Sequence, residues 1–200
     1  SEPVTVVLVT HDLREAVDAV GPGGFSKYQK LLELLTDKKK GLGWSPRKKD
    51  DRLVIFTESL QTLAFLQENL RRDLKLDKGL RKASKASKKK TAKKKSKKSS
   101  KRKINQVEIL HGQLPDTEIQ QIVEEFGKES SKVRVLIASD VASEGINLHY
   151  LCHRLIHFDV PWSLMVFQQR NGRVDRFGQP AELVRSIMMF SPDSAIDGAV

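Results

Sequence analysis

Short apolar runs alternate with segments of helical periodicity along most of the chain. The runs are rich in β-branched residues, as in strands buried on both faces of a sheet, and they lie at 52–58, 106–110, 133–139, 153–159 and 184–190. Between them, apolar residues recur at helical spacing, which predicts helices at 25–37, 59–72, 116–128 and 163–175. This alternation predicts an α/β fold, a parallel sheet with helices on both faces.

Polar residues gather directly after several predicted strands, at 57–59, 111–116, 139–145 and 159–163. Ligands of parallel α/β sheets sit beyond the carboxyl ends of the strands, so we expect the binding site at this edge. Ser59 and Asp116 stand where they would cap the helices that follow. His111 directly precedes Gly112, which favours a turn over a catalytic histidine.

The first 25 residues do not fit this alternation. The stretch PVTVVLVTHD has the composition of a strand, and the glycines within 21–24 break the chain after it. We expect residues 1–25 to be a lead-in or the end of a preceding element, and residues 26–200 to form one domain.

The net charge of +11 is concentrated in one segment. Residues 71–103 hold 18 of the 36 Lys and Arg residues and two of the 25 acids, so this segment carries +16 and the rest of the chain −5. Residues 77–103 lack apolar periodicity, which predicts a disordered insert. It is either a solvated linker or an arm that binds phosphates. The candidate contacts are Lys88, Lys89, Lys90, Lys93, Lys94 and Lys95.

Composition excludes several classes of protein. The single cysteine, Cys152, rules out an intrachain disulfide and a cysteine-based zinc site, and its apolar surroundings predict a buried position. We find no signal peptide and no apolar run near the roughly 18 residues of a membrane span. We therefore expect no membrane contact and no metal site. The expected location is intracellular, in the cytoplasm or nucleoid of a bacterium or the nucleus of a eukaryote.

The segment QQRNGRVDRFGQ, residues 168–179, carries arginines at every third position. If this segment is helical, Arg173 and Arg176 lie on roughly one face, beside Gly172. Taken alone, such a segment could be a solvated arginine face on a surface helix. Its place shortly after the run LIHFDVPW puts it instead at the expected binding edge.

This segment resembles the last conserved motif of superfamily-two helicases. It is closest to the form Q-R-x-G-R-x-x-R-x-G-Q of SWI/SNF-type DNA translocases and their bacterial relatives. Other segments resemble further motifs of the same motor domain, in the same order: LVIFTESLQTLAFLQENL, ILHGQLPDTEIQQIVEEF, ASDVASEGINL and IHFDVPWSLMVFQQR. The resemblance covers roughly residues 26–190 apart from the lysine-rich insert, and it implies a RecA-like helicase C-terminal domain.

The resemblance also implies tasks for the arginines. In this family two RecA-like domains clamp ATP and Mg²⁺ between them, and the second domain supplies arginines across the cleft. Arg176 takes the position of the arginine finger and Arg173 that of a phosphate contact, both of which complement charge on the γ-phosphoryl oxygens. Gln169 matches a residue near the γ-phosphate. Arg170 is expected to hold the motif to its neighbours.

Further positions match the motifs one by one. Gly145 is expected to permit a turn at the cleft, and Asn147 to contact the nucleotide sugar or to orient the arginines. Gly172 is expected to let the helix approach closely. Ser139 matches a position that contacts a nucleic-acid phosphate, and we assign Thr57 to nucleic acid as well.

The sequence also departs from the family pattern. Ile119 stands where many relatives carry an arginine, and Ser163 where SWI/SNF-type enzymes often have asparagine. The Ser-Glu-Gly sequence at 143–145 is nearer to bacterial relatives than to chromatin remodellers, which counts against a nucleosome substrate. Asp140 and Glu144 are expected only to brace their loop.

No phosphate-binding loop of the form G-x-x-x-x-G-K-[ST] occurs, and no Asp-Glu box ends a strand. Gly127 and Lys128 are followed by Glu129 and come after a helix, whereas a phosphate loop follows a strand. We therefore expect half of a motor. An N-terminal RecA-like domain of the same protein would hold most of the ATP and Mg²⁺, and the present part alone would not hydrolyse ATP.

The function that we expect is the C-terminal motor domain of an ATP-dependent translocase or helicase on double-stranded DNA. One alternative keeps the motor and changes the track to RNA. Another is a non-catalytic module that binds nucleic acid through the lysine-rich arm. The presence of both Arg173 and Arg176 argues against the non-catalytic alternative, because a dead motor has no reason to keep them.

Overall fold

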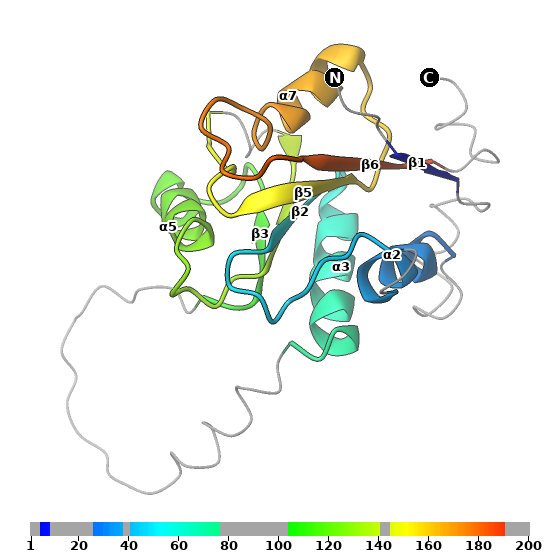
Figure 1. The fold of residues 1–200 in the computed structure, drawn as a ribbon, viewed down its shortest axis with the longest axis horizontal. Helices are drawn as coiled ribbons and strands as arrows, with labels where there is room; N and C mark the ends of the chain where they lie inside the picture. Colours follow the sequence, from blue (N-terminus) through cyan, green and yellow to red (C-terminus); the bar gives the residue numbers. More distant parts are fainter. Residues whose placement is uncertain (1–4, 9–25, 38–40, 77–103, 141–144, 191–200) are drawn as a thin grey trace, which may run out of the picture.

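The architecture is a six-stranded, entirely parallel sheet in the order β1-β6-β5-β2-β4-β3 (Figure 1). The computed structural model describes residues 5–8, 26–37, 41–76, 104–140 and 145–190. The strands are β1 Thr5–Leu8, β2 Arg52–Phe56, β3 Val107–Leu110, β4 Val135–Ala138, β5 Cys152–His157 and β6 Arg185–Phe190. The helices are α2 Ser26–Thr36, α3 Leu60–Asp73, α5 Asp116–Phe126 and α7 Leu164–Asn171. The predicted α/β fold with a parallel sheet is confirmed.

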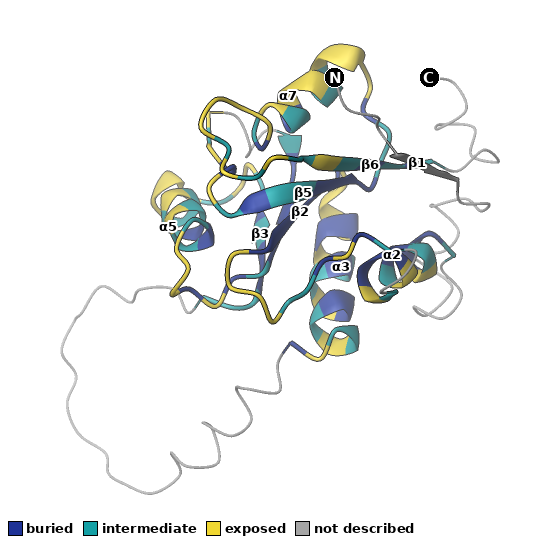
Figure 2. Cartoon of the chain, in the orientation of Figure 1, coloured by how far each residue is buried: buried dark blue, intermediate teal, exposed yellow. Residues whose placement is uncertain are grey.

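Helices cover both faces of the sheet, as predicted. Successive residues of β2 point to opposite faces, since Leu53 and Ile55 join one core cluster and Val54 and Phe56 join the other. The first cluster holds the buried apolar residues of α2 and α3, and the second holds those of α5. Figure 2 shows the buried strands between helices whose outer surfaces are exposed.

The strand β1 extends the sheet at one edge. It pairs in parallel with β6, in a register that places Val6 opposite Met188. Residues 5–8 thus lie in the same sheet as the rest of the domain, although their partner is about 180 positions away in sequence. The other residues of the 1–25 segment lie outside the described part of the chain, as does the lysine-rich insert at 77–103 with all of its candidate contacts.

The predicted helix caps are half right. Ser59 caps α3, because its side chain accepts a hydrogen bond from the backbone N–H of Thr62. Asp116 does not cap α5. Pro115 takes the cap position with φ −60° and ψ 144°, and Asp116 becomes the first helical residue. The fixed φ of proline supplies the cap geometry, and the carboxylate of Asp116 still lies in the first turn, where the helix dipole favours it.

The helix before the arginines is shorter than predicted. We expected it to span 163–175, but α7 ends at Asn171 and Gly172 is its C-cap. Arg173 and Arg176 therefore do not share a helix face, and lie in the turn that follows. Gly172 has φ −63° and ψ −8°, so it is not a left-handed stop, and the low helix propensity of glycine is what favours an end of the helix before the second arginine.

Cys152 is completely buried on β5, as expected from its apolar surroundings.

None of the helices in the described ranges has the length and apolar character that a membrane crossing requires.

Candidate functional site

The carboxyl ends of three central strands lie side by side. Phe56, the last residue of β2, is in register with Ala138 at the end of β4 and with His157 at the end of β5. An acid lies two residues after the end of each strand, namely Glu58, Asp140 and Asp159. The parallel register therefore gathers three carboxylates at one edge of the sheet.

Arg170 of α7 closes this carboxylate cluster. Its guanidinium donates to both carboxylate oxygens of Asp140, at 2.6 and 2.7 Å, in the two-pronged geometry that favours arginine. It also donates to the Asp159 carbonyl at 3.2 Å and to the Glu58 carboxylate at 3.4 Å. Only 1% of the side chain is exposed. The expected role of Arg170, which is to hold the motif to its neighbours, is confirmed.

The cluster contains three carboxylates and a single guanidinium, that of Arg170. Burial raises the pKa of Glu58, and the neighbouring carboxylates of Asp140 and Asp159 raise it further. A hydrogen bond from Trp162 and the charge of Arg170 act in the opposite direction. Protonation of Glu58 therefore becomes easier than in a free carboxyl group.

Thr57 and Ser139 lie at these strand ends and are both buried. Thr57 is completely buried and its hydroxyl donates to the carboxylate of Asp159, which also accepts from the Glu58 backbone N–H at 3.1 Å. Ser139 is 7% exposed, and its backbone N–H donates to Leu110 at 2.9 Å. In this conformation the Thr57 hydroxyl braces β2 against β5 and offers no donor to a phosphate.

The turn after α7, residues 172–178, lies against the loop that follows β4. Arg176 is exposed, and its guanidinium donates to the side-chain carbonyl of Asn147. The backbone N–H of Leu148 donates to the carbonyl of Arg173 at 2.9 Å. The Nε atom of Arg173 is buried and has no hydrogen-bond partner in the described part of the chain. Gln169 is exposed on α7. The structure thus brings both arginines next to the Gly145–Asn147 segment.

Two glycines shape this junction. Gly145 has φ +75° and Gly178 has φ +89°, conformations that favour glycine over residues with a side chain. The chain turns at Gly145 as expected, and the place of this turn at a nucleotide cleft stays a prediction. Gly172 differs from expectation, because a Cβ there would first meet the Gln168 carbonyl of its own segment, at 3.3 Å. It ends α7 and does not mediate the approach of another element.

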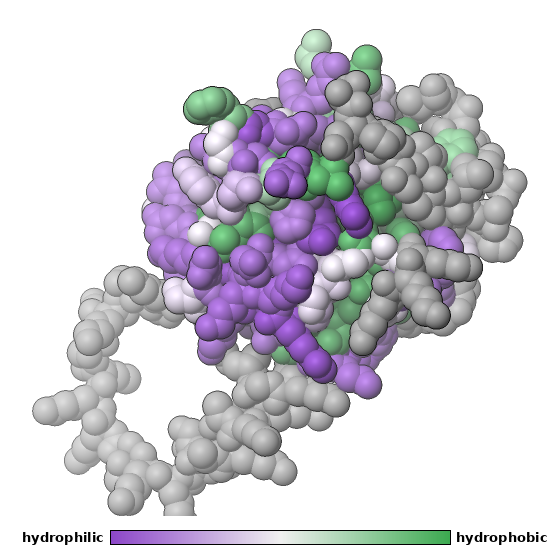
Figure 3. Space-filling view, viewed as in Figure 1, coloured by the Kyte–Doolittle hydropathy of each residue, from purple (hydrophilic) through white to green (hydrophobic). Residues whose placement is uncertain are grey.

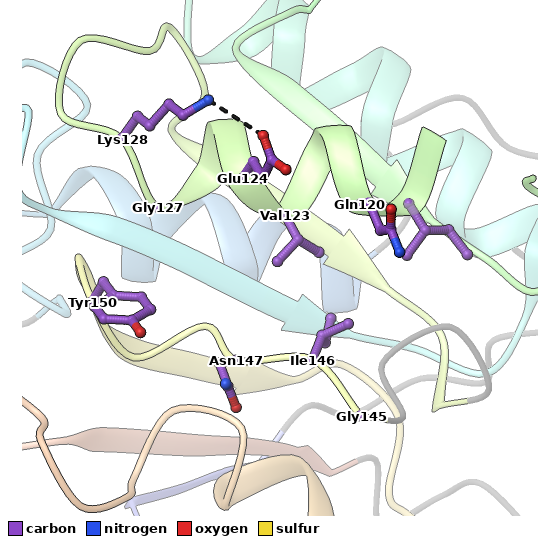
Figure 4. A pocket seen from close by; sticks show the side chains of 10 residues that line it. Gln120, Val123, Glu124, Gly127, Lys128, Gly145, Ile146, Asn147 and Tyr150 are labelled. Atoms are coloured by element: carbon purple, nitrogen blue, oxygen red, sulfur yellow. Dashed lines mark hydrogen bonds and ion pairs between the residues drawn. The ribbon is translucent and has the colours of Figure 1, made fainter. Parts of the chain in front are cut away.

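A cavity of about 580 Å³ opens between α5 and the loop after β4 (Figure 4). Its lining residues are Ile119, Gln120, Val123, Glu124, Gly127, Lys128, Gly145, Ile146, Asn147 and Tyr150. Ile119, which stands in place of the family's arginine, contributes to its apolar wall. Asn147 borders the cavity and also holds Arg176, so the cavity adjoins the arginine turn.

Sequence reasoning missed two residues that shape this edge. His157 at the end of β5 contacts Asn171 and Ser186, and Gln179 donates to the carbonyls of Cys152 and Val174 at 3.0 and 2.8 Å. The position of His157 within the last three residues of the predicted strand 153–159, next to the expected binding edge, was a usable signal. Gln179 belongs to the arginine motif, but its spacing alone gives no indication of the backbone groups that it holds.

Residues 26–178 match the family model of the helicase conserved C-terminal domain. The chain belongs to this family. The match covers more than half of the sequence and includes the motifs on which the resemblance to superfamily-two, SWI/SNF-type enzymes rests, apart from Gln179 at the end of the last one, so that expectation is confirmed.

Relatives match shorter stretches. Uncharacterized ATP-dependent helicase YqhH of Bacillus subtilis (strain 168) is 44% identical over 52 residues, 26% of this chain and 9% of that protein. RNA polymerase-associated protein RapA of Pectobacterium carotovorum subsp. carotovorum (strain PC1) is 34% identical over 82 residues, 41% of this chain and 8% of that protein. The matched stretches span less than a tenth of either relative.

Two solved structures share the fold. One is the C-terminal part of the Fun30 ATPase domain, with a TM-score of 0.57 and 20% identity, over 84% of this chain and 42% of that chain. The other is a hypothetical ATP-dependent RNA helicase from Sulfolobus tokodaii, with a TM-score of 0.51 and 20% identity, over 94% and 37% of the two chains. The domain is RecA-like, as expected.

Proposed function

We propose that this domain is the C-terminal motor half of an ATP-dependent DNA translocase or helicase, and that it supplies Arg173 and Arg176 to ATP bound mainly on an N-terminal RecA-like domain. The observation that carries the proposal is the contrast among three arginines of one motif. Arg170 is buried and surrounded by acceptors. Arg173 keeps an unpaired Nε, and Arg176 is exposed beside Asn147.

The donor set fits a nucleotide phosphate. ATP would supply the transferable γ-phosphoryl group, whose oxygens carry negative charge during transfer. Arg176 presents a permanently charged, planar donor to such oxygens. Arg173 keeps a buried Nε–H without an acceptor, which would reach a phosphate only if the turn shifts when the nucleotide binds. Asn147 keeps Arg176 oriented, and Gly145 supports the loop that carries Asn147. Gln169 lies in the last helical turn of α7, just before residues 172–178, and would approach the same phosphate.

We assign Mg²⁺ to the N-terminal RecA-like domain. Within the described ranges, no group of three or more His, Cys, Asp or Glu side chains could hold a metal ion. The sequence also has no phosphate loop and no acidic box. We therefore propose that the isolated domain does not hydrolyse ATP, and that turnover needs the N-terminal RecA-like domain.

The outer edge of the site has the character of a contact surface. Trp162, Leu164 and Met165 are large apolar residues that are 78%, 70% and 67% exposed at the start of α7. In Figure 3 apolar atoms emerge near α7 from a largely hydrophilic surface. Exposed apolar residues that lie close together are typical of surfaces that meet another domain or a ligand. This patch supports a second motor domain or a nucleic acid at the arginine edge.

We propose double-stranded DNA as the track. The lysine-rich insert would add phosphate contacts that do not depend on base sequence. Ser139 and Thr57 would contact the backbone only if the strand ends open on binding. Such a motor works inside the cell, in the cytoplasm or nucleoid of a bacterium or in the nucleus of a eukaryote.

Two alternatives have distinct signatures. An RNA helicase would show ATPase activity that RNA stimulates more than double-stranded DNA. A passive binding module would bind nucleic acid through the insert without ATP turnover. ATPase assays of the full-length protein with each nucleic acid distinguish the three functions.

The test of the proposed function is Arg176→Ala in the full-length protein. We expect ATP affinity within a few-fold of wild type and turnover reduced by roughly 10³-fold, the scale of an arginine finger. Arg176→Lys should not restore turnover, because an ammonium cannot reproduce the planar fork. Arg47→Ala is the matched control, since Arg47 is an exposed arginine on the loop before β2. Turnover above a third of wild type in Arg176→Ala would refute the assignment.

A further inference from the structure

A small polar cluster lies beneath the arginine turn. His157 ends β5, Asn171 ends α7, and Ser186 lies on β6. The His157 Nε2 atom is 3.1 Å from the Asn171 Oδ1 atom and 3.2 Å from the Ser186 hydroxyl, which itself donates to Asn171 Oδ1 at 3.0 Å. Three elements that are separate in sequence therefore converge on one side-chain carbonyl.

The imidazole of His157 is a neutral donor. An amide carbonyl can only accept, so the proton lies on Nε2, and the buried Nδ1 atom, which has no partner among the described residues, carries the lone pair. Burial lowers the pKa of His157 to about 4, and the charge of Arg170 also lowers it. The Asn171 hydrogen bond and the charge of Asp140 oppose this shift.

Aromatic rings fix the orientation of this imidazole. The ring of His157 is stacked on Phe56 of β2 with 6.1 Å between centroids, and it contacts Phe167 of α7 at 4.8 Å. The side chain is completely buried. The donor thus approaches Asn171 from one fixed direction, and the contact with Phe167 ties α7 to the end of β5.

Asn171 connects this cluster to the arginines. Its backbone carbonyl accepts the N–H groups of Val174 at 2.9 Å and Asp175 at 2.7 Å, which closes the turn around Arg173. The carbonyl of Arg173 in turn accepts from Leu148, in the loop that holds Asn147. The side chain of Asn171 therefore sets the start of the turn that carries both candidate arginines.

We propose that His157 is a positioning residue for the arginine turn: its neutral Nε2–H holds Asn171 and so directs Arg173 and Arg176 toward the nucleotide. This inference rests on the proposed function. His157 does not touch the nucleotide, and it acts only through the geometry of the turn. A displacement of about 1 Å at a catalytic group can cost about 10²-fold in rate, so a buried anchor of this kind can affect turnover strongly.

The test compares His157→Leu with His157→Gln in the full-length protein at saturating DNA. The leucine variant removes the donor and keeps an apolar side chain. We expect its kcat to fall at least 10-fold while KM for ATP changes less than about threefold, because an orienting contact matters most in the transition state. The glutamine variant keeps an N–H donor and should recover most of the loss. His153→Leu on the same strand, at the opposite end, should leave kcat unchanged.

A double variant separates positioning from general damage. If His157 acts only through the arginines, adding His157→Leu to Arg176→Ala should lower kcat by less than the product of the two single losses, because only Arg173 is left to be displaced. Fully additive losses would overturn the inference, as would a folded His157→Leu protein with more than half of wild-type kcat. If His157→Leu does not fold, Asn171→Ala keeps the imidazole and should show the same loss of kcat. Normal kcat in a folded Asn171→Ala protein would also refute the role.

The same assays separate this inference from the proposed function. Loss of turnover in Arg176→Ala together with normal turnover in His157→Leu would reject the positioning role and leave the arginine assignment intact. Normal turnover in Arg176→Ala would reject the arginine assignment, and with it the positioning role of His157.

Discussion

The two edges of the sheet use arginine in different ways. At the amino edge, an arginine lies at or near the start of each of four strands: Arg52, Arg134, Arg154 and Arg185. All four donate to main-chain carbonyls of nearby loops, namely those of Lys128, Pro46 and, for the last two arginines, Leu42. At the carboxyl edge, Arg170 donates mainly to carboxylates, and Arg173 and Arg176 keep donors for other acceptors.

The difference lies in what can reach the guanidinium groups. Arg52 also has unpaired nitrogens, but its side chain is completely buried, and burial lowers its pKa to about 10. No ligand can reach donors in that position. Arg176, in contrast, is exposed, and it lies next to the loop in which Gly145 has a positive φ. Unpaired donors indicate a binding site only where they combine with access, which Arg176 has. The unpaired Nε atom of Arg173 is itself buried, so access supports Arg176 more strongly than Arg173.

The largest expected effect tests this comparison directly. Arg170→Met should lower the unfolding free energy by about 3–5 kcal/mol, because it leaves Asp140 and the half-buried Glu58 without their counter-charge. Arg154→Met is the matched change at the amino edge, where Asp51 loses its partner. Urea unfolding should show several kcal/mol lost in both, and ATPase assays of the folded full-length proteins should show lost turnover only for Arg170→Met. Equal losses of turnover would mean that the edges do not differ in function.

The next effect concerns acid stability at the carboxyl edge. His157 has a folded pKa of about 4 against an ordinary value of 6.5, so the unfolded chain binds its proton more readily than the folded one. The contribution of the neutral imidazole to the free energy of unfolding is complete above pH 6.5 and is lost as the pH falls toward 4. Over this range the difference in pKa corresponds to a loss of roughly 3 kcal/mol of unfolding free energy.

Urea titrations from pH 7 to pH 4 measure this acid sensitivity. His157→Gln has no imidazole at that position and should lose less stability than wild type over the range. His153 at the amino edge is the comparison, because burial also lowers its pKa. His153→Gln should change the loss of unfolding free energy with falling pH less than His157→Gln does, since the ring of His153 is less buried. An unchanged acid slope in His157→Gln would show that the imidazole is not held neutral.

The sequence predicted the fold well because the relevant signals are local. Strands such as 52–58 and 133–139 are apolar runs, and helices such as 59–72 have a regular apolar face. The edge position of β1 could not be predicted in this way, since it depends on pairing with β6 across most of the chain. The end of α7 was also misjudged, because the pattern of arginines suggested continued helix and Gly172 prevails over it.

The site was predictable in its composition and less so in its contacts. Two separate motifs, one with Asn147 and one with Arg173 and Arg176, assigned these residues to one site, and the structure brings them together at the carboxyl edge. Thr57 was assigned to nucleic acid from its place in a motif, but its hydroxyl is buried against Asp159, a partner 102 residues away. Contacts of this kind depend on strand order, which the spacing of residues in a sequence does not encode.

The smallest expected effect compares two helices that begin at the carboxyl edge with the same cap. Ser59 and Ser163 each accept a backbone N–H at 3.3 Å, from Thr62 in α3 and from Val166 in α7. The 14 residues of α3 are anchored in the core by several buried leucines, whereas Arg170 is the buried residue of the eight in α7. Loss of a serine cap costs about 1 kcal/mol.

Because α3 unfolds only with the core, Ser59→Ala should lower the global unfolding free energy by about 1 kcal/mol and leave turnover unchanged. Ser163→Ala should lower global stability less, because α7 can fray locally while the sheet stays folded. Faster amide exchange at Val166 and Phe167 would report this fraying, and turnover should fall a few-fold because α7 carries the arginine turn. Slow exchange at both amides in a folded Ser163→Ala protein would show that Arg170 alone is enough to hold α7, and that the cap does not contribute to the site.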